Sequence, residues 1–144
     1  MKNILFVIIC LFFTVRAQSQ SLSAKELVNF FDTHNKTEFL KSRSFTRLGS
    51  DVSEKGVTLH FDKNTGTSKQ ETLTVGSTTL SYFTRNKDYI NNLLAQLQRQ
   101  YKQTVKDDDA DFSYYLFAAG GSKKISVNIS KTGAKSYTIG VIDR

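Results

Sequence analysis

The hydrophobic pattern of this chain changes from a helical period to a period of two, and it does so twice. In the middle of the chain, apolar side chains recur at helical spacing while polar ones occupy the opposite, wet side. The apolar set is Ile90, Leu93, Leu94, Leu97 and Tyr101, and the polar set is Gln96, Gln98, Arg99 and Gln100. Helices followed by alternating strands are typical of an α+β fold. We therefore expect one largely antiparallel sheet of six to eight strands, with helices on one face.

Another helix is predicted earlier in the chain, before the first group of strands. Ser23 and Glu26 have the spacing of a capping box, and Leu22 and Leu27 have that of a hydrophobic staple. A further short helical turn is expected within residues 35–40. Both helical regions therefore lie directly before strand-like sequence.

Strand-like alternation follows each helical region. In the first half the alternating apolar residues are Val57, Leu59, Phe61, Leu73, Val75, Leu80 and Tyr82. In the second half the predicted strands are residues 112–117, 125–129 and 137–141, separated by Gly120-Gly121-Ser122 and Thr132-Gly133. Short connections with glycine suit β-hairpins, so we expect antiparallel neighbours.

The two halves of the chain, residues 22–84 and 85–144, align weakly with each other. An offset of 56 or 57 residues matches Phe45 with Tyr101, Leu59 with Tyr115, Phe61 with Phe117, Leu73 with Ile129, Leu80 with Tyr137 and Tyr82 with Ile139. These matches are compatible with a tandem duplication and equally with two unrelated units. In architecture alone, tandem units of a helix and four strands resemble the secreted β-lactamase-inhibitor proteins, which act by binding another protein. No motif of that family is matched, so the resemblance implies no residue role or activity here.

The beginning of the chain predicts an export signal. A positive residue is followed by an apolar run, residues 4–13, which is too short to span a bilayer. Small residues then allow cleavage after Ala17 or after Ser19. We expect residues 1–17 to be a cleaved signal peptide and residues 18–144 to form a single α+β domain, in the periplasm or outside the cell.

Cleavage removes the single cysteine of the chain, Cys10. The mature domain therefore has no disulfide, no thiolate metal site and no cysteine nucleophile. Loss of Lys2 and Arg16 leaves 18 basic residues against 13 acidic ones. This mildly basic balance does not indicate a nucleic-acid partner, and no apolar run after residue 15 approaches the length of a membrane span.

Few residues could carry out catalysis. The two histidines, His34 and His60, each have an aspartate two positions away, Asp32 and Asp62. In a strand this spacing places His60 and Asp62 on one side, but no Gly-x-Ser-x-Gly elbow supplies a nucleophile. Histidine pairs with metal-binding spacing are absent, and no phosphate loop is present, so we predict no metal and no cofactor.

One acidic cluster, residues 107–111, has carboxylates at alternate positions, as calcium ligands often are. Read as a calcium loop starting at Asp107, it has Phe112 where glycine is needed and Ala118 where the bidentate glutamate is needed. We interpret the cluster as a solvated turn.

The face of the sheet that points away from the helices is the predicted binding surface. If Leu59, Phe61, Ile125, Val127 and Ile129 face the helices, the residues pointing away are Thr58, His60, Thr72, Thr74, Ser126, Asn128 and Ser130. Phe112, Tyr114 and Leu116 also point away, which makes them candidate binding residues on a polar face. Two alternatives are that a loop or terminus covers this strand, or that its register is shifted by one residue.

Two functions from different classes follow. The leading hypothesis is an exported, non-catalytic module that binds a protein, a peptide or an envelope polymer through this face and its basic rim. The alternative is a small secreted hydrolase that uses His60 with Asp62, or His34 with Asp32. Replacing both histidines separates the two hypotheses, because no other side chain of the chain titrates near neutral pH.

Overall fold

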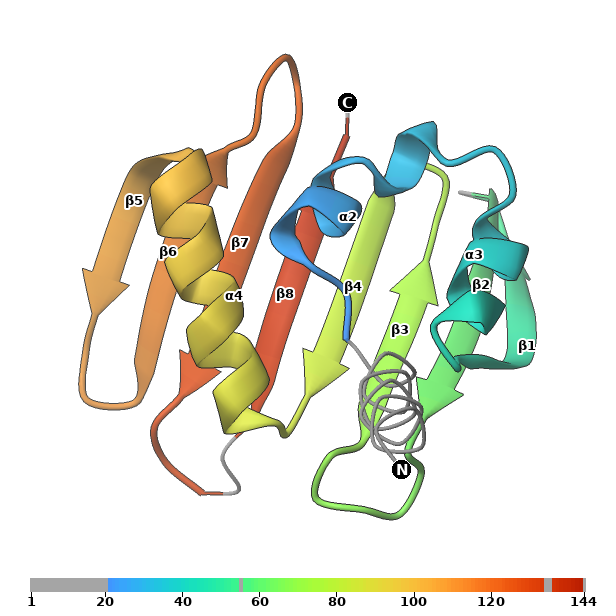
Figure 1. The fold of residues 1–144 in the computed structure, drawn as a ribbon, viewed down its shortest axis with the longest axis horizontal. Helices are drawn as coiled ribbons and strands as arrows, with labels where there is room; N and C mark the ends of the chain where they lie inside the picture. Colours follow the sequence, from blue (N-terminus) through green and yellow to red (C-terminus); the bar gives the residue numbers. More distant parts are fainter. Residues whose placement is uncertain (1–20, 55, 134–135, 144) are drawn as a thin grey trace, which may run out of the picture.

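The computed structural model describes residues 21–54, 56–133 and 136–143. The predicted signal peptide, the cleavage positions and Cys10 lie outside the described residues. Within them a single eight-stranded sheet has the order β1-β2-β3-β4-β8-β7-β6-β5, and every neighbouring pair of strands is antiparallel (Figure 1). The strands are β1 (Thr46–Ser53), β2 (Gly56–Lys63), β3 (Glu71–Val75), β4 (Thr79–Thr84), β5 (Lys102–Asp108), β6 (Phe112–Ala118), β7 (Lys124–Ser130) and β8 (Tyr137–Ile142).

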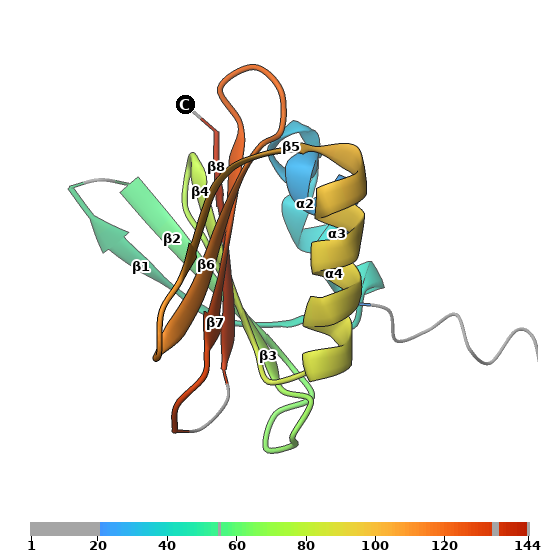
Figure 2. The same ribbon diagram turned by 90° about the vertical axis from the view of Figure 1, so that its left-hand side faces the viewer.

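Helices are few and short compared with the sheet. They are α2 (Ala24–Val28), the 3₁₀ turn η2 (Phe30–Asp32), α3 (Lys36–Ser42) and α4 (Lys87–Gln100). All of them lie on one face of the sheet (Figure 2). The fold is therefore roughly α+β, as predicted, and it consists mostly of sheet. None of the helices in the described part of the chain is long and apolar enough to cross a membrane.

The strand order is symmetric about the centre of the sheet. Each half of the chain supplies four consecutive strands, and the halves meet where β4 pairs with β8. Both edge hairpins carry an irregularity at the matching place, between Arg47 and Gly49 in β1 and between Gln103 and Val105 in β5. Common descent of the halves remains a prediction.

One detail of the predicted alignment differs from the ladder of the sheet. Leu73 lies opposite Phe61, and the residue opposite Phe117 is Ile125. If Phe61 and Phe117 are equivalent, Leu73 therefore corresponds to Ile125 and not to Ile129. The reason is that the β6–β7 connection is shorter than the β2–β3 connection, and a sequence offset does not show such a length change.

Alternate strand residues build the core against the helices. The hydrophobic strand residues that are buried on this side are Phe61, Leu73, Val75, Leu80, Tyr82, Phe117, Ile125, Val127, Tyr137, Ile139 and Val141. From the helices, Leu27, Leu40, Ile90, Leu93 and Leu97 pack onto them, each at most 1% exposed. The period-two pattern of the sequence therefore assigned the faces of β2, β6 and β7 correctly.

Side-chain caps fix the N-terminal ends of α2, α3 and α4, and the one at Ser23 was predicted from the sequence. Ser23 and Glu26 form the capping box of α2, with both reciprocal hydrogen bonds present. Asn35 caps α3 and Asn86 caps α4, each accepting a backbone N–H of the first turn. On α4, however, Gln96 is not simply solvated, because its Oε1 accepts a hydrogen bond from the Ala24 N–H at 3.2 Å.

A buried polar cluster joins the beginning of the described chain to the sheet. Glu71 is 2% exposed, and its carboxylate accepts hydroxyl hydrogen bonds from Tyr82 and from Ser21, each at 2.5 Å. Tyr89 of α4 packs against Tyr82 with the two rings tilted by 59° and their centroids 5.5 Å apart, and its hydroxyl donates to the Leu22 carbonyl at 2.7 Å. Burial raises the pKa of both tyrosines above the ordinary value, so their hydroxyls remain donors to high pH.

Lys63 lies beside this cluster and directly opposite Glu71 on the neighbouring strand. Its side chain is buried, and its Nζ lies 5.3 Å from the centre of the Phe45 ring. Among the described residues this Nζ has no hydrogen-bond acceptor. The ammonium group therefore lies over the Phe45 ring without a direct hydrogen bond in the described part of the chain.

Candidate binding face of the sheet

The face of the sheet opposite the helices carries the predicted binding residues, and we call it the far face. No described helix lies over it (Figure 2). On four consecutive strands of the sheet, β4, β8, β7 and β6, the residues that point to this side alternate with the buried core residues. We call these residues the central patch: Thr79, Ser81, Phe83, Thr138, Gly140, Ile142, Lys124, Ser126, Asn128, Ser130, Phe112, Tyr114, Leu116 and Ala118.

Phe112, Tyr114 and Leu116 form an apolar strip along β6, on the side that the sequence predicted. Each lies directly opposite a polar residue of β7, since Phe112 pairs with Ser130, Tyr114 with Asn128 and Leu116 with Ser126. Phe112 is 49% exposed, and the other two are half-buried. The predicted register is therefore the one observed, whereas the binding role of the strip remains a prediction.

Small side chains form the floor beside this strip. One row across the sheet runs from Leu116 through Ser126, Gly140 and Ser81 to Thr74. At Gly140 a β-carbon would lie 2.6 Å from the Ser126 Oγ, so the hydroxyl occupies the space that a side chain would need. The centre of the far face is consequently low and lined with hydroxyl groups, which suits direct hydrogen bonding to a ligand laid across it.

A second row places two aromatic rings on either side of polar residues. It runs from Tyr114 through Asn128 and Thr138 to Phe83. With neighbouring strands about 4.8 Å apart, the two rings are separated by three strand spacings, or about 14 Å. Local alternation does not indicate this row, because Phe83 is brought to it by pairing with β8, a strand from the other half of the chain.

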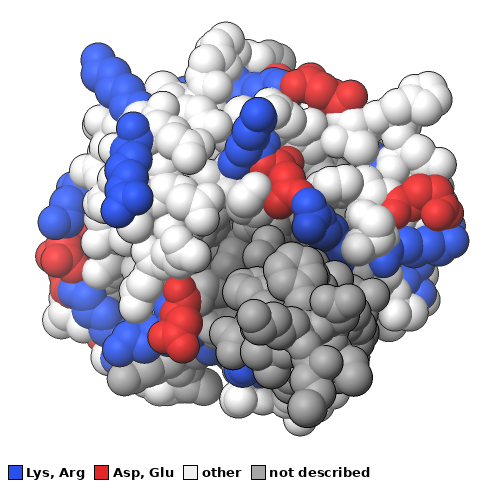
Figure 3. Space-filling model, in the orientation of Figure 1, with Lys and Arg blue, Asp and Glu red and all other residues white. Residues whose placement is uncertain are grey.

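Charged side chains are concentrated away from the central patch. Within the patch, Lys124 is the single charged residue, although 23% of the whole chain is charged. On the far face of the flanking strands, charge is present at Asp51, Asp62, Lys102 and Asp107. On the helix side, basic and acidic side chains are interspersed (Figure 3). The central patch is thus distinguished by a low content of charge, confined to Lys124 at the start of β7.

The two edges of the sheet are protected against pairing with another strand. Both edge strands, β1 and β5, are interrupted by a register shift. Each also carries charges, including Arg47 and Asp51 on β1 and Lys102 and Lys106 on β5. Bulges and edge charges disfavour addition of a strand, so the face is a better candidate for binding than either edge.

The histidine of the far face has a different partner from the one predicted. His60 Nε2 lies 2.9 Å from the Asp51 carboxylate on β1, and its Nδ1 lies 3.5 Å from the Thr74 hydroxyl. Asp62 is on the same face but accepts hydrogen bonds from the Lys63 N–H at 2.7 Å and the Thr65 hydroxyl at 2.6 Å. Asp62 therefore holds the β2–β3 turn, and the structure pairs His60 with Asp51.

The other predicted pair, His34 and Asp32, lies at the C-terminal end of η2. Asp32 accepts a hydrogen bond from Lys123 at 2.6 Å, which ties the 3₁₀ turn to the β6–β7 loop. This hydrogen bond raises the pKa of Lys123. Asp32 therefore has an observed structural partner, and it comes from the second half of the chain.

The acidic cluster is a hairpin turn closed by a lysine. Asp107 and Asp108 belong to β5, a strand that the sequence analysis did not predict, and the turn follows them. Asp109 accepts the backbone N–H groups of Asp111 and Phe112, and these hydrogen bonds lower its pKa. Lys131 contacts Asp108 and, with the Ser113 hydroxyl, lowers the pKa of that carboxyl. In the described ranges no group of three or more acidic, histidine or cysteine residues could hold a metal ion.

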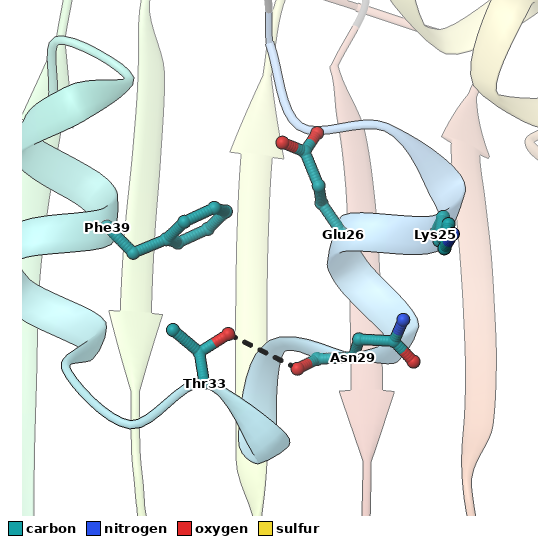
Figure 4. A pocket seen from close by; sticks show the side chains of 5 residues that line it. All are labelled: Lys25, Glu26, Asn29, Thr33 and Phe39. Carbon is teal, nitrogen blue, oxygen red and sulfur yellow. Dashed lines mark hydrogen bonds between the residues drawn. The ribbon is translucent and has the colours of Figure 1, made fainter.

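Among the described residues, the hollows include two that are lined mainly by residues of the helices and of the segment before α2. The smaller, of about 170 Å³, lies between α2 and α3 and is lined by Lys25, Glu26, Asn29, Thr33 and Phe39 (Figure 4). Its acidic group already accepts hydrogen bonds from the Ser23 N–H and hydroxyl and contacts Arg43. The larger, of about 360 Å³, is lined by Ser21, Leu22, Ser23, Tyr89, Asn92 and Gln96. In the larger hollow, Gln96 and Tyr89 join α4 to the start of the described chain through Ala24 and Leu22.

Comparisons of the chain with protein-family models, with curated proteins and with solved structures found no match.

Proposed function

We propose that this protein is an exported, non-catalytic binding module that holds a partner on the far face of its sheet. One observation carries the proposal: the central patch combines an exposed apolar strip with a floor of small polar residues, and no described helix covers it. Exposed apolar groups on a polar surface are typical of interaction sites. Export follows from the predicted signal peptide, and the periplasm or the extracellular space is the expected location.

The observed hydrogen bonds favour binding over hydrolysis. The carboxylates nominated as partners of the two histidines, Asp62 and Asp32, have structural roles in a turn and at a helix end. His60 and Asp51 form a pair, but the hydroxyl close to His60, that of Thr74, lies on a regular strand and not on a strained turn. A histidine-activated nucleophile is recognised by its close hydrogen bond to the base, and the 3.5 Å separation of the Thr74 hydroxyl from His60 Nδ1 is too long for that role.

The test is a capture experiment with face variants. The exported protein is immobilised and exposed to the envelope extract and culture fluid of the cells that produce it. Tyr114→Ala should weaken capture of the partner by about 1 kcal/mol or more, the scale of an aromatic anchor. Leu48→Ala is the matched control, because Leu48 is an apolar residue of β1 that is 64% exposed and lies outside the central patch.

Two further measurements make the test decisive. The double variant His34→Ala/His60→Ala should retain capture, whereas a hydrolase would lose its activity. Tyr114→Ala should lower the free energy of unfolding by well under the roughly 3 kcal/mol that truncation of an aromatic core residue costs, because Tyr114 is half-buried. Capture that is unchanged by Tyr114→Ala, or weakened equally by Leu48→Ala, would show that the far face is not the binding site.

A further inference from the structure

We infer that the partner of the central patch is an uncharged polysaccharide, laid across the strands from β6 towards β4. This inference rests on the proposed function, and it names the chemistry of the partner. Three independent properties of the patch support it: its neutrality, its hydrogen-bonding groups and the spacing of its aromatic rings.

The neutrality of the patch selects against charged partners. At the average charge content of the chain, 23%, fourteen surface positions would carry about three charges, yet Lys124 is the single one and lies at the start of β7. Charged polymers and charged protein surfaces are recognised by complementary charges, which also speed their association. A patch without such charges offers no Coulombic attraction to an anionic or cationic polymer, and a neutral partner needs none.

The polar groups of the patch match hydroxyl-rich ligands. The groups are the hydroxyls of Thr79, Ser81, Ser126, Ser130 and Thr138 and the amide of Asn128. Hydroxyl and amide groups both donate and accept, as sugar hydroxyls do. The cores of protein–protein interfaces are instead depleted in serine and enriched in arginine, methionine and aromatic residues. Five of the fourteen patch residues are serine or threonine, and arginine and methionine do not occur among them, so the polar part of the patch favours a glycan over a protein.

The aromatic rings provide stacking surfaces beside these groups. Phe112 and Tyr114 are neighbours on one face of β6, and each is opposite a hydrogen-bonding residue of β7. The apolar C–H face of a sugar ring can cover such an aromatic ring while the sugar hydroxyls reach Ser130 and Asn128. Phe83 repeats the arrangement about 14 Å away on β4. A single sugar cannot reach both ends of that row, which is why an extended polymer is inferred.

The experiment is affinity electrophoresis of the exported protein in native gels. The gels contain dextran, soluble starch, laminarin or hydroxyethylcellulose as neutral polysaccharides, and alginate as a charged one. We expect retardation by at least one neutral polysaccharide, no retardation by alginate, and little effect of added salt. Tyr114→Ala should weaken the retarding interaction about tenfold or more, and Leu48→Ala should leave it unchanged.

Charge variants at Asn128 test the neutrality of the partner directly. Asn128 is exposed, so Asn128→Asp and Asn128→Lys should both fold and should both weaken binding, because each places a charge against an uncharged ligand. A charged partner would instead be bound more tightly by one of the two variants. Strengthening by either charge, or retardation by alginate alone, would overturn the inference.

Failure of the inference can be separated from failure of the proposed function. If no neutral polysaccharide retards the protein, while capture of an envelope protein depends on Tyr114 and not on Leu48, the far face is a binding site with a protein partner. The polysaccharide inference is then wrong. If a polysaccharide does retard the protein but all face variants are retarded equally, both the inference and the proposed face are wrong.

Discussion

Ser81 and Gly140 lie directly opposite each other on β4 and β8, at the centre of the eight-stranded sheet. They belong to different halves of the chain, and the strand order is symmetric about the strands that carry them. On the next strand, Ser126 lies opposite Gly140, with its hydroxyl 3.5 Å from the Gly140 carbonyl. Three small residues in a row thus leave the middle of the far face without large side chains.

The first prediction concerns the space at Gly140. Gly140→Ala should lower the free energy of unfolding by about 1 kcal/mol, because the added carbon would lie 2.6 Å from the Ser126 Oγ. Ser126→Ala removes that oxygen. The double variant should therefore recover most of the loss, and urea titration of the four proteins gives the coupling energy. Additive effects would mean that the two residues do not share the space.

Much of the architecture could be predicted because it is encoded locally. The capping box at Ser23, the helical spacing of Leu93 and Leu97, and the alternation around Phe61 each require only a few neighbouring residues. The far-face position of Tyr114 was predicted for the same reason, since the period of a strand is two.

The features that were missed depend on distant residues or on exposure. β5 was not predicted, because all seven of its residues are exposed. Its sequence is almost entirely polar or charged, so it lacks the alternation of apolar and polar residues that indicates a strand. The pairing of His60 with Asp51 arises from the β1–β2 register. The contact of Lys131 with Asp108 likewise joins two hairpins. No local spacing indicates such contacts, so the predicted partner of His60 was the aspartate nearest in sequence.

The second prediction tests the core of α4. Leu93→Ala or Leu97→Ala should destabilise the protein by about 2–5 kcal/mol, because both side chains are at most 1% exposed. Gln98 is exposed on the same helix, so Gln98→Ala is the matched control and should be nearly silent. Equal denaturation midpoints for the three variants would show that the helix does not pack as described.

Gln96 gives an intermediate case on the same helix. The sequence pattern placed it on the solvent-exposed side of the helix, but its side chain accepts a hydrogen bond from the Ala24 N–H at the start of α2. Gln96→Ala should therefore cost about 1 kcal/mol, the net value of one hydrogen bond. An effect as small as that of Gln98→Ala would mean that this link between α2 and α4 contributes nothing.

The third prediction concerns the lysine beside the polar cluster. Lys63→Met keeps the aliphatic chain and removes a buried ammonium that has no acceptor among the described residues. A buried charge without a hydrogen bond is costly, so the variant should be as stable as the natural protein or more stable by about 1 kcal/mol. The measurement is urea-induced unfolding of the protein and of the variant. A clear loss of stability would show that the ammonium group makes a favourable contact, with Glu71 as the nearest candidate.

The last prediction concerns the buried tyrosine pair at alkaline pH. Burial, then the neighbouring Tyr89 and Glu71, raises the pKa of Tyr82 above the value of about 10 that it has in an unfolded chain. A raised pKa in the folded state favours the protonated form. The resulting stability is present below pH 10 and is lost as the pH rises above it, because the unfolded chain then releases a proton that the folded protein retains.

Tyr82→Phe separates the hydrogen bond from this titration. At pH 8 the variant should be less stable by about 1–3 kcal/mol, because the Glu71 carboxylate loses one of the two hydrogen bonds that it accepts from hydroxyl groups. Above pH 10, the stability of the variant should fall less steeply with pH than that of the natural protein. The two slopes should differ by roughly 1.4 kcal/mol per pH unit, which corresponds to the release of about one proton on unfolding. Tyr114→Phe is the control, since Tyr114 is half-buried on the far face. Equal slopes for Tyr82→Phe and the natural protein between pH 10 and 11 would mean that Tyr82 ionises in the folded state as readily as in the unfolded chain.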